Sequence, residues 1–165
     1  MPVLEEKVMA PKEILLISDP KVLSIPIKDN SDPLINLLDF PEILVDRRKS
    51  RDSKSFALIR RSVFKKLLAA QKLLPQSTRL LVIEAYRPIS LQKRYFYEYS
   101  ARLVKAHPNW NKKRIYEEAN KYVAPPEIIP PHVTGGAVDL TLAAIDGKEL
   151  DLGTIVNADP QKSNR

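Results

Sequence analysis

A histidine and an aspartate stand seven residues apart in the stretch PPHVTGGAVDLTL, residues 130–142. From position 137 the residues alternate as in a β-strand, which predicts one face with Ala137, Asp139 and Thr141 and an opposite face with Val138, Leu140 and Leu142. We therefore expect Asp139 to face away from the core, and Gly135 and Gly136 to let the chain turn so that His132 approaches it. An imidazole and a carboxylate together suit zinc or another borderline divalent ion. The same pair also fits a surface histidine and an aspartate that caps a turn.

The composition restricts which metal sites are possible. The 165 residues contain no cysteine and two histidines, His107 and His132. Disulfides and thiolate metal sites are therefore excluded, and zinc could use only histidine and carboxylate ligands. His107 precedes a proline, which predicts that it lies at the carboxyl end of a helix. A protonated imidazole is favourable there without any metal.

A second group of polar residues follows an apolar run, RLLVIEA at residues 79–85. This run predicts a central strand that is buried on both faces. It delivers Glu84, Tyr86 and Arg87 to its carboxyl end, where Pro88 biases Arg87 toward an extended conformation. Arg87 could bind a ligand carboxylate, or it could form an ion pair with Glu84 or another nearby acid.

The other segments predict an α+β fold with a small antiparallel sheet flanked by helices, in a single domain that spans residues 1–165. Prolines divide residues 1–54 into short segments that would wrap the domain as edge strands and turns, one of them the turn at residues 30–33. Apolar spacing predicts helices over residues 55–74, from a cap at Ser90 to His107, and over residues 112–123. Asp146-Gly147 predicts a hairpin that pairs the strand of Asp139 with residues 150–152.

The charge and hydropathy patterns bear on partners and location. The net charge is +7, and the densest basic cluster, residues 47–54, has no accompanying aromatic residues. We interpret that cluster as a solvated loop, and we expect no nucleic-acid partner; DNA binding that weakens with salt would contradict this. The sequence contains no apolar run of membrane-spanning length and no export signal. We therefore expect a soluble, cytoplasmic protein with no membrane partner.

Three motifs together resemble the D-alanyl-D-alanine dipeptidases of the zinc peptidase family M15. They are EAYRP at residues 84–88, HVTGGAVDLTL at residues 132–142 and LDLGT at residues 150–154. The resemblance implies the M15 peptidase fold and one zinc ion per site, with His132 and Asp139 as metal ligands. It implies that Arg87 binds the substrate and stabilises the developing oxyanion. Tyr86 and Thr134, which lie beside these residues, are expected to contact a small peptide with a free carboxylate.

The sequence departs from this family in two respects, of which the smaller is that Pro130-Pro131 precedes His132 where the family's resistance enzymes carry serines. The family takes its third ligand and its general base from a later Glu-x-x-His motif, and residues 1–165 contain no such motif. The expected function is hydrolysis of D-alanyl-D-alanine or a related peptidoglycan-derived peptide. The alternatives are a D,D-carboxypeptidase that acts on peptidoglycan stems and a non-catalytic relative that binds a muropeptide or a metal. We expect residues 1–165 alone to bind zinc weakly and to hydrolyse D-alanyl-D-alanine negligibly.

Overall fold

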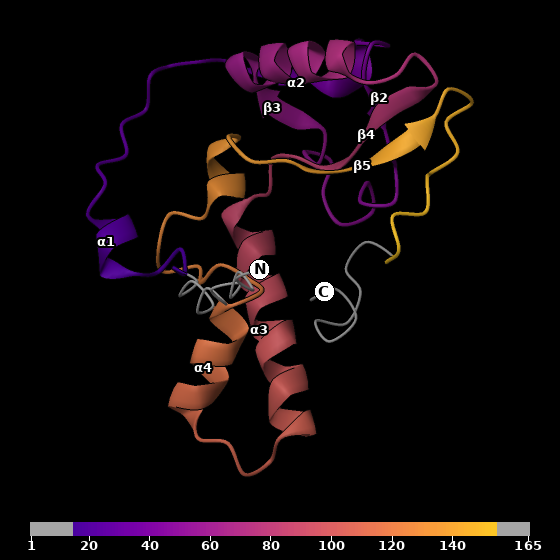
Figure 1. Cartoon of the computed structure of the whole chain (residues 1–165). Coiled ribbons are helices and arrows are strands. Elements are labelled where there is room, and N and C mark those ends of the chain that lie inside the picture. Colours follow the sequence, from indigo (N-terminus) through magenta and orange to yellow (C-terminus); the bar gives the residue numbers. More distant parts are fainter. Residues whose placement is uncertain (1–14, 155–165) are drawn as a thin grey trace, which may run out of the picture.

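A computed structural model describes residues 15–154 of the chain (Figure 1). The elements follow in this order: α1 (Pro20–Leu23), β1 (Leu34–Asn36), the 3₁₀ helix η1 (Leu37–Asp39), β2 (Leu44–Val45), β3 (Leu58–Arg60), α2 (Arg61–Leu73), β4 (Thr78–Glu84), α3 (Ile89–Ala106), α4 (Lys112–Asn120), the 3₁₀ helix η2 (Pro131–Thr134) and β5 (Asp139–Ala144). Helix α2 lies across one side of the strands, and α3 and α4 extend together from the other side (Figure 1). The class is thus mixed α and β, with small sheets and helices, as expected.

The strands form two small sheets. β1 pairs antiparallel with β3, and the order in the other sheet is β2-β4-β5. β4 is the central strand of that sheet, as its apolar sequence predicts. The expectation of a purely antiparallel sheet is wrong, because β2 from the proline-rich segment pairs with β4 in parallel. The early segment therefore contributes to the sheet as well as wrapping around it.

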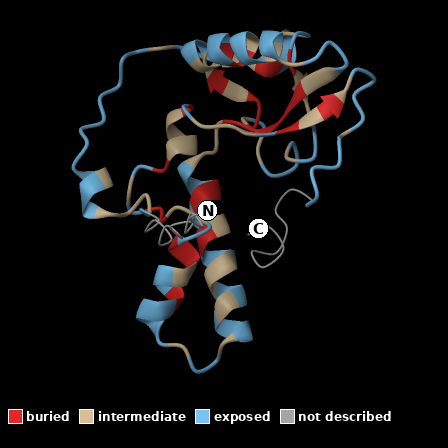
Figure 2. Cartoon of the chain, viewed as in Figure 1, coloured by how far each residue is buried: buried red, intermediate tan, exposed pale blue. Residues whose placement is uncertain are grey.

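The main core lies between α2 and the sheets. Its buried residues are Leu37, Ile43, Phe56, Ala57, Ile59, Phe64, Leu67, Leu80, Val82 and Ala85. Burying large apolar side chains of this kind contributes about 1.5–3 kcal/mol each. The buried residues concentrate in the strands, in the adjoining side of α2 and in the part of α3 nearest the sheet (Figure 2). The free ends of α3 and α4 are mostly exposed, so the rigid surroundings of a site lie at the sheet.

The helix predicted over residues 55–74 begins six residues late. Residues 58–60 form β3, in which Ile59 pairs with Ile35 of β1 and is fully buried. The apolar spacing of Phe56 and Ile59 fits a helix, but pairing with a distant strand decided the conformation. Arg60 therefore belongs to β3 and not to the helix, and its Nε donates a hydrogen bond to the carbonyl oxygen of Thr134 at 2.8 Å.

The two later helices form a hairpin in which the ring of Phe96 from α3 contacts the ring of Tyr116 from α4 edge-on. α3 ends before His107, as Pro108 predicts, but it begins at Ile89 with Pro88 at its N-cap and no capping side chain. The predicted cap at Ser90 is therefore wrong. α4 ends at Asn120, three residues earlier than predicted, although the N–H groups of Tyr122 and Val123 still donate to the carbonyl of Ala119.

The remaining turn predictions are only partly confirmed. Gly147 has a φ of +86°, as the Asp146-Gly147 turn requires, but the return strand over residues 150–152 is reduced to one bridge between Ala143 and Glu149. Between α1 and β1 no regular element forms at residues 30–33, although Ser31 has a φ of +57°. Among the helices within residues 15–154, none has the length and apolarity that crossing a membrane requires.

Candidate functional site

A β-bulge brings two carboxylates to the same face of the sheet. Val82 of β4 is opposite Leu140 of β5, yet Glu84 is opposite Asp139, so Ile83 is the extra residue. Opposed residues of an antiparallel pair share a face, whereas a regular strand would have placed Glu84 beside Val82 in the core under α2. The bulge thus redirects Glu84 toward Asp139 at the end of the strand.

The strand faces around Asp139 differ from those predicted. Val138 and Leu142 pack against the main core, as expected. Thr141, expected to share an open face with Asp139, is buried opposite Leu81. The face toward α3 is therefore also closed along the middle of β5, and only its beginning, at Asp139, opens toward a site.

The backbone fixes the orientation of His132. The N–H of Arg87 donates to the carbonyl of His132 at 3.2 Å, and the imidazole Nδ1 lies 2.8 Å from the carbonyl oxygen of Ala85. A carbonyl oxygen can only accept a hydrogen bond, so Nδ1 carries the proton and Nε2 is the nitrogen left for another partner. The chain turns sharply after this residue at Gly135, where φ is +71° and a Cβ atom would lie 2.5 Å from the Leu34 side chain. Both features require glycine, as the sequence suggested.

The free nitrogen of His132 faces Asp139. Nε2 of His132 lies 3.4 Å from Oδ1 of Asp139. Two electron-pair donors at this distance require a cation between them, which can be a proton on the imidazole or a metal ion. Two ligands about 2.0–2.1 Å from a tetrahedral zinc ion are about 3.3 Å from each other. The pair therefore has the separation of two zinc ligands, and the structure brings together the residues that the sequence motif suggested.

The surroundings of Asp139 keep its carboxylate ionised. Burial raises the pKa of Asp139, but the hydrogen bond and charge of His132, followed by the charges of Arg87 and Lys49, lower it further than burial raises it. The net direction is below the ordinary value for aspartate. A divalent ion would replace the imidazolium proton between the two groups, because metal binding requires an ionised carboxylate and an unprotonated Nε2.

Arg87 is held on three sides. Its Nη2 donates to Oε2 of Glu84 at 2.6 Å and lies 3.4 Å from Oδ2 of Asp139, while its Nη1 donates to Oε1 of Gln92 at 2.8 Å. Glu84 is 1% exposed, so the predicted alternative of an ion pair with Glu84 is present in the structure. Gln92 is equally buried and donates its Nε2 to the carbonyl of Ala124 at 2.7 Å. Oε1 of Glu84 and Nε of Arg87 are buried without a partner among residues 15–154.

A tyrosine of α3 connects this group to the basic loop after β2. The guanidinium of Arg87 lies 4.9 Å from the ring centroid of Tyr95, and Nζ of Lys49 lies 4.7 Å from it. Lys49 also donates to the Tyr95 hydroxyl at 3.1 Å, and that hydroxyl donates to Asp52 at 3.0 Å. Burial raises the pKa of Tyr95, so the phenol keeps the proton that it donates. The prediction that residues 47–54 form a solvated loop is therefore wrong for Lys49.

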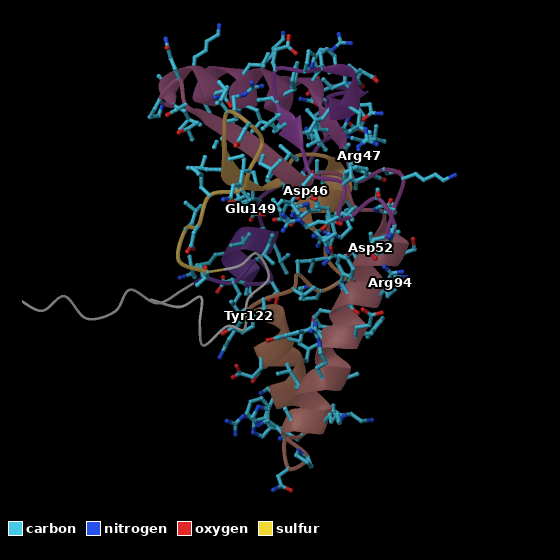
Figure 3. The ribbon with its side chains drawn as sticks, turned by 90° about the vertical axis from the view of Figure 1, so that its right-hand side faces the viewer. Asp46, Arg47, Asp52, Arg94, Tyr122 and Glu149 are labelled. Carbon is cyan, nitrogen blue, oxygen red and sulfur yellow. The ribbon has the colours of Figure 1, made fainter. Side chains whose placement is uncertain are left out.

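The basic loop is anchored on both sides of the site. Arg48 pairs with Asp46 and with Glu149 beyond the Asp146-Gly147 turn, while Asp52 pairs with Arg94 of α3 at 2.7 Å. Asp46 and Glu149 lie near one another, and Asp52 lies beside Arg94, which is on α3 (Figure 3). Burial raises the pKa of Asp46, but the hydrogen bond from Arg48, the largest influence, gives it a net lowering. The loop is thus fixed where Lys49 enters the site.

The other candidate residues have different surroundings. Tyr86 is half-buried, and its backbone N–H donates to the carbonyl of Leu58. The Thr134 hydroxyl donates to the carbonyl of Pro131 at 2.7 Å and accepts from the N–H of Gly136, so it is occupied within its own turn. His107 stacks on Trp110 with ring centroids 3.7 Å apart at the far end of α3, and exposed Asp151 accepts a local hydrogen bond from Gly153. Neither His107 nor Asp151 is brought to His132.

Sequence reasoning missed Gln92, Lys49 and Tyr95 as members of this site. Gln92 is the one buried polar residue of α3, yet its amide is indistinguishable in the sequence from any polar helix position. Tyr95 fits the apolar spacing of its helix, and aromatic residues at that spacing usually pack in the core. Its spacing of eight residues from Arg87 was the available signal, since α3 begins directly after that arginine and returns Tyr95 to the same side.

Within residues 15–154, no cluster of three histidine, cysteine or carboxylate side chains has the geometry to hold a metal ion. No protein-family model, curated protein or solved structure significantly matches the chain.

Proposed function

We propose that this protein is a zinc-dependent dipeptidase that hydrolyses D-alanyl-D-alanine or a related peptide derived from peptidoglycan. The observation that carries the proposal is the 3.4 Å approach of His132 Nε2 to Asp139 Oδ1 directly beside the guanidinium of Arg87. The three motifs that suggested this function come from separate parts of the sequence. Two of them, at residues 84–88 and 132–142, supply all three of these residues.

His132 and Asp139 would hold the metal. The Ala85 carbonyl orients His132 through Nδ1, which is the usual arrangement around a zinc-binding histidine. When bound, zinc supplies polarisation of the scissile carbonyl and activation of a water molecule. A catalytic zinc ion normally has three protein ligands, so a third ligand from outside residues 15–154 is required. The general base would have the same origin, because Glu84 is buried and paired with Arg87.

Arg87 would provide a fixed positive charge for the transition state. Glu84 and Gln92 hold two of its nitrogens, and the Tyr95 ring lies against the guanidinium. A cation that is already positioned loses little energy to reorganisation when negative charge develops on a substrate oxygen. The planar guanidinium also keeps donors in a defined direction, which an ammonium group does not.

A non-catalytic relative that binds a metal or a muropeptide is the second candidate. It is favoured by the lack of a third ligand near His132 and Asp139 in the described part of the chain. A D,D-carboxypeptidase would use the same two ligands and the same arginine, and differs in the length of the peptide that it accepts.

The test is performed on the protein as its gene encodes it. Purified protein should contain zinc, release alanine from D-alanyl-D-alanine, lose this activity to a chelator and regain it with zinc. Cleavage of a stem pentapeptide in preference to the dipeptide would identify the carboxypeptidase. Zinc or peptide binding without turnover would identify the binding protein, and a protein that binds neither zinc nor peptide and hydrolyses neither peptide would reject all three. Asp139→Asn is the control, because it should remove both metal and activity.

A further inference from the structure

Lys49 differs from the other basic residues of its loop. Arg47, Arg51 and Lys54 are exposed, whereas the Lys49 side chain is 19% exposed and turns toward α3. Its ammonium lies against the face of the Tyr95 ring and donates to the hydroxyl of the same residue. Burial alone would lower the pKa of Lys49, but the hydrogen bond to Tyr95 and the charges of Glu84 and Asp52 raise it above the ordinary value. Lys49 is therefore a fixed, positively charged group at the edge of the site.

Most of the hydrogen-bonding capacity of this ammonium is unused. One of its three N–H donors reaches Tyr95. Asp52 lies 3.7 Å from Nζ, beyond hydrogen-bonding distance, because Asp52 is already held by Arg94 at 2.7 Å and by the Tyr95 hydroxyl at 3.0 Å. Among residues 15–154, two donors of Lys49 therefore have no hydrogen-bond acceptor.

Arg87, the neighbouring cation, is in the opposite situation. Both of its terminal nitrogens already donate to protein groups, Nη2 to Glu84 and Nη1 to Gln92, and Asp139 lies 3.4 Å from Nη2. Arg87 and Lys49 each lie less than 5 Å from the centroid of the Tyr95 ring, so both belong to one site. Two carboxylates of the protein already compensate Arg87, whereas Lys49 is the cation with donors to spare.

We propose that Lys49 binds the carboxylate group of the ligand, with the Tyr95 ring and hydroxyl holding its ammonium in place. The two cations of the site would thus have different roles. Lys49 would bind the free carboxylate of the ligand, and Arg87 would contact the reacting group. The assignment of this carboxylate to a peptide rests on the proposed function. The binding of a carboxylate by Lys49 does not depend on the proposed function.

The first experiment uses acetate as the probe and needs no catalytic activity. The ring signals of Tyr95 are followed by NMR in the full chain while sodium acetate is added at constant ionic strength against sodium chloride. A saturable, acetate-specific shift is expected in the wild type and in Lys54→Gln, which changes an exposed lysine of the same loop. The shift should be absent in Lys49→Gln and in Lys49→Met. Amide spectra establish whether each variant is folded. If Lys49→Gln is not folded, Lys49→Met is used in its place.

Two results would overturn the inference. One is a wild-type protein in which acetate shifts Tyr95 no more than chloride does. The other is an acetate-specific shift that persists in a folded Lys49→Gln or Lys49→Met protein, which would place the anion elsewhere.

The second experiment compares D-alanyl-D-alanine with its C-terminal amide. If Lys49 binds the carboxylate, Lys49→Gln should raise KM for the free acid by about 10- to 100-fold, the range for loss of a charged hydrogen bond, and leave KM for the amide unchanged. An equal change for both peptides would contradict the assignment. If the wild type hydrolyses neither peptide, the proposed function fails, and the acetate experiment still decides the role of Lys49.

Discussion

The two ends of α3 carry similar side chains in different surroundings. At the end near the sheet, His132, Arg87 and the Tyr95 ring come together, and at the far end His107 stacks on Trp110 with Arg114 4.2 Å from the Trp110 ring centroid. Each end thus has a histidine, an aromatic ring and an arginine. Only the end near the sheet adds carboxylates, because β4 and β5 bring Glu84 and Asp139 to one face. In the described part of the chain His107 has no carboxylate partner, so residue types alone do not define a site.

The largest expected difference between the two ends is in metal binding. His132→Ala and Asp139→Ala should each weaken zinc binding by more than about 100-fold, since loss of a second-shell partner alone costs 10- to 100-fold. His107→Ala should not change it, because an 18-residue helix places His107 about 27 Å from the start of α3. Competition with a zinc-binding dye measures all three. Wild-type affinity in His132→Ala, or a loss in His107→Ala, would invert the assignment.

The arginines sharpen the comparison. Arg87→Lys should retain the fold but slow the turnover of D-alanyl-D-alanine. The activation free energy should rise by about 2–4 kcal/mol, because lysine keeps the charge without the planar donors. Arg114→Lys, beside Trp110, should leave turnover unchanged. Steady-state kinetics of the two variants are the measurement, and near-normal turnover by Arg87→Lys would show that Arg87 is structural.

Buried and exposed acids should also differ between the two ends. Glu84→Gln leaves the Arg87 guanidinium without its principal counterion and should lower the free energy of unfolding by about 3 kcal/mol. Glu117→Gln on α4, whose ion pair with Lys113 is long and exposed, should change it by less than about 0.5 kcal/mol. Urea denaturation gives both values. Equal values would mean that Glu84 is better solvated than its 1% exposure indicates.

The smallest expected effects are those of replacing two glutamines, Gln71 and Gln92. Gln71 bridges the backbone of Thr78 and Leu80, and Gln92 bridges Arg87 and Ala124. Gln71→Leu and Gln92→Leu should both lower the free energy of unfolding by about 1–2 kcal/mol, because each leaves partly buried partners unpaired. Only Gln92→Leu should also lower turnover, since it alone removes a hydrogen bond from the Arg87 guanidinium. Equal turnover in the two variants would limit Gln92 to a structural role.

The sequence predicted features that local chemistry determines. The central strand at residues 79–85, the helix end before Pro108 and the turn at Gly147 all follow from apolar runs, proline and glycine. The approach of His132 to Asp139 was predicted because both residues lie in one short segment. The bulge at Ile83 and the strand at residues 58–60 were not predicted, because both depend on pairing with a distant segment. Lys49 was missed for the same reason, since its partner Tyr95 lies 46 residues further along the chain.

The bond between the His132 ring and the Ala85 carbonyl has a consequence for sequence variation. Because the acceptor is a main-chain atom, no change of side chain at position 85 can delete it. Position 85 is completely buried, so only small residues fit there, and each of them would preserve the carbonyl. The ring orientation is therefore encoded in the path of the backbone. Mutations that disturb it must bend the strand itself, and they should appear first as defects in folding.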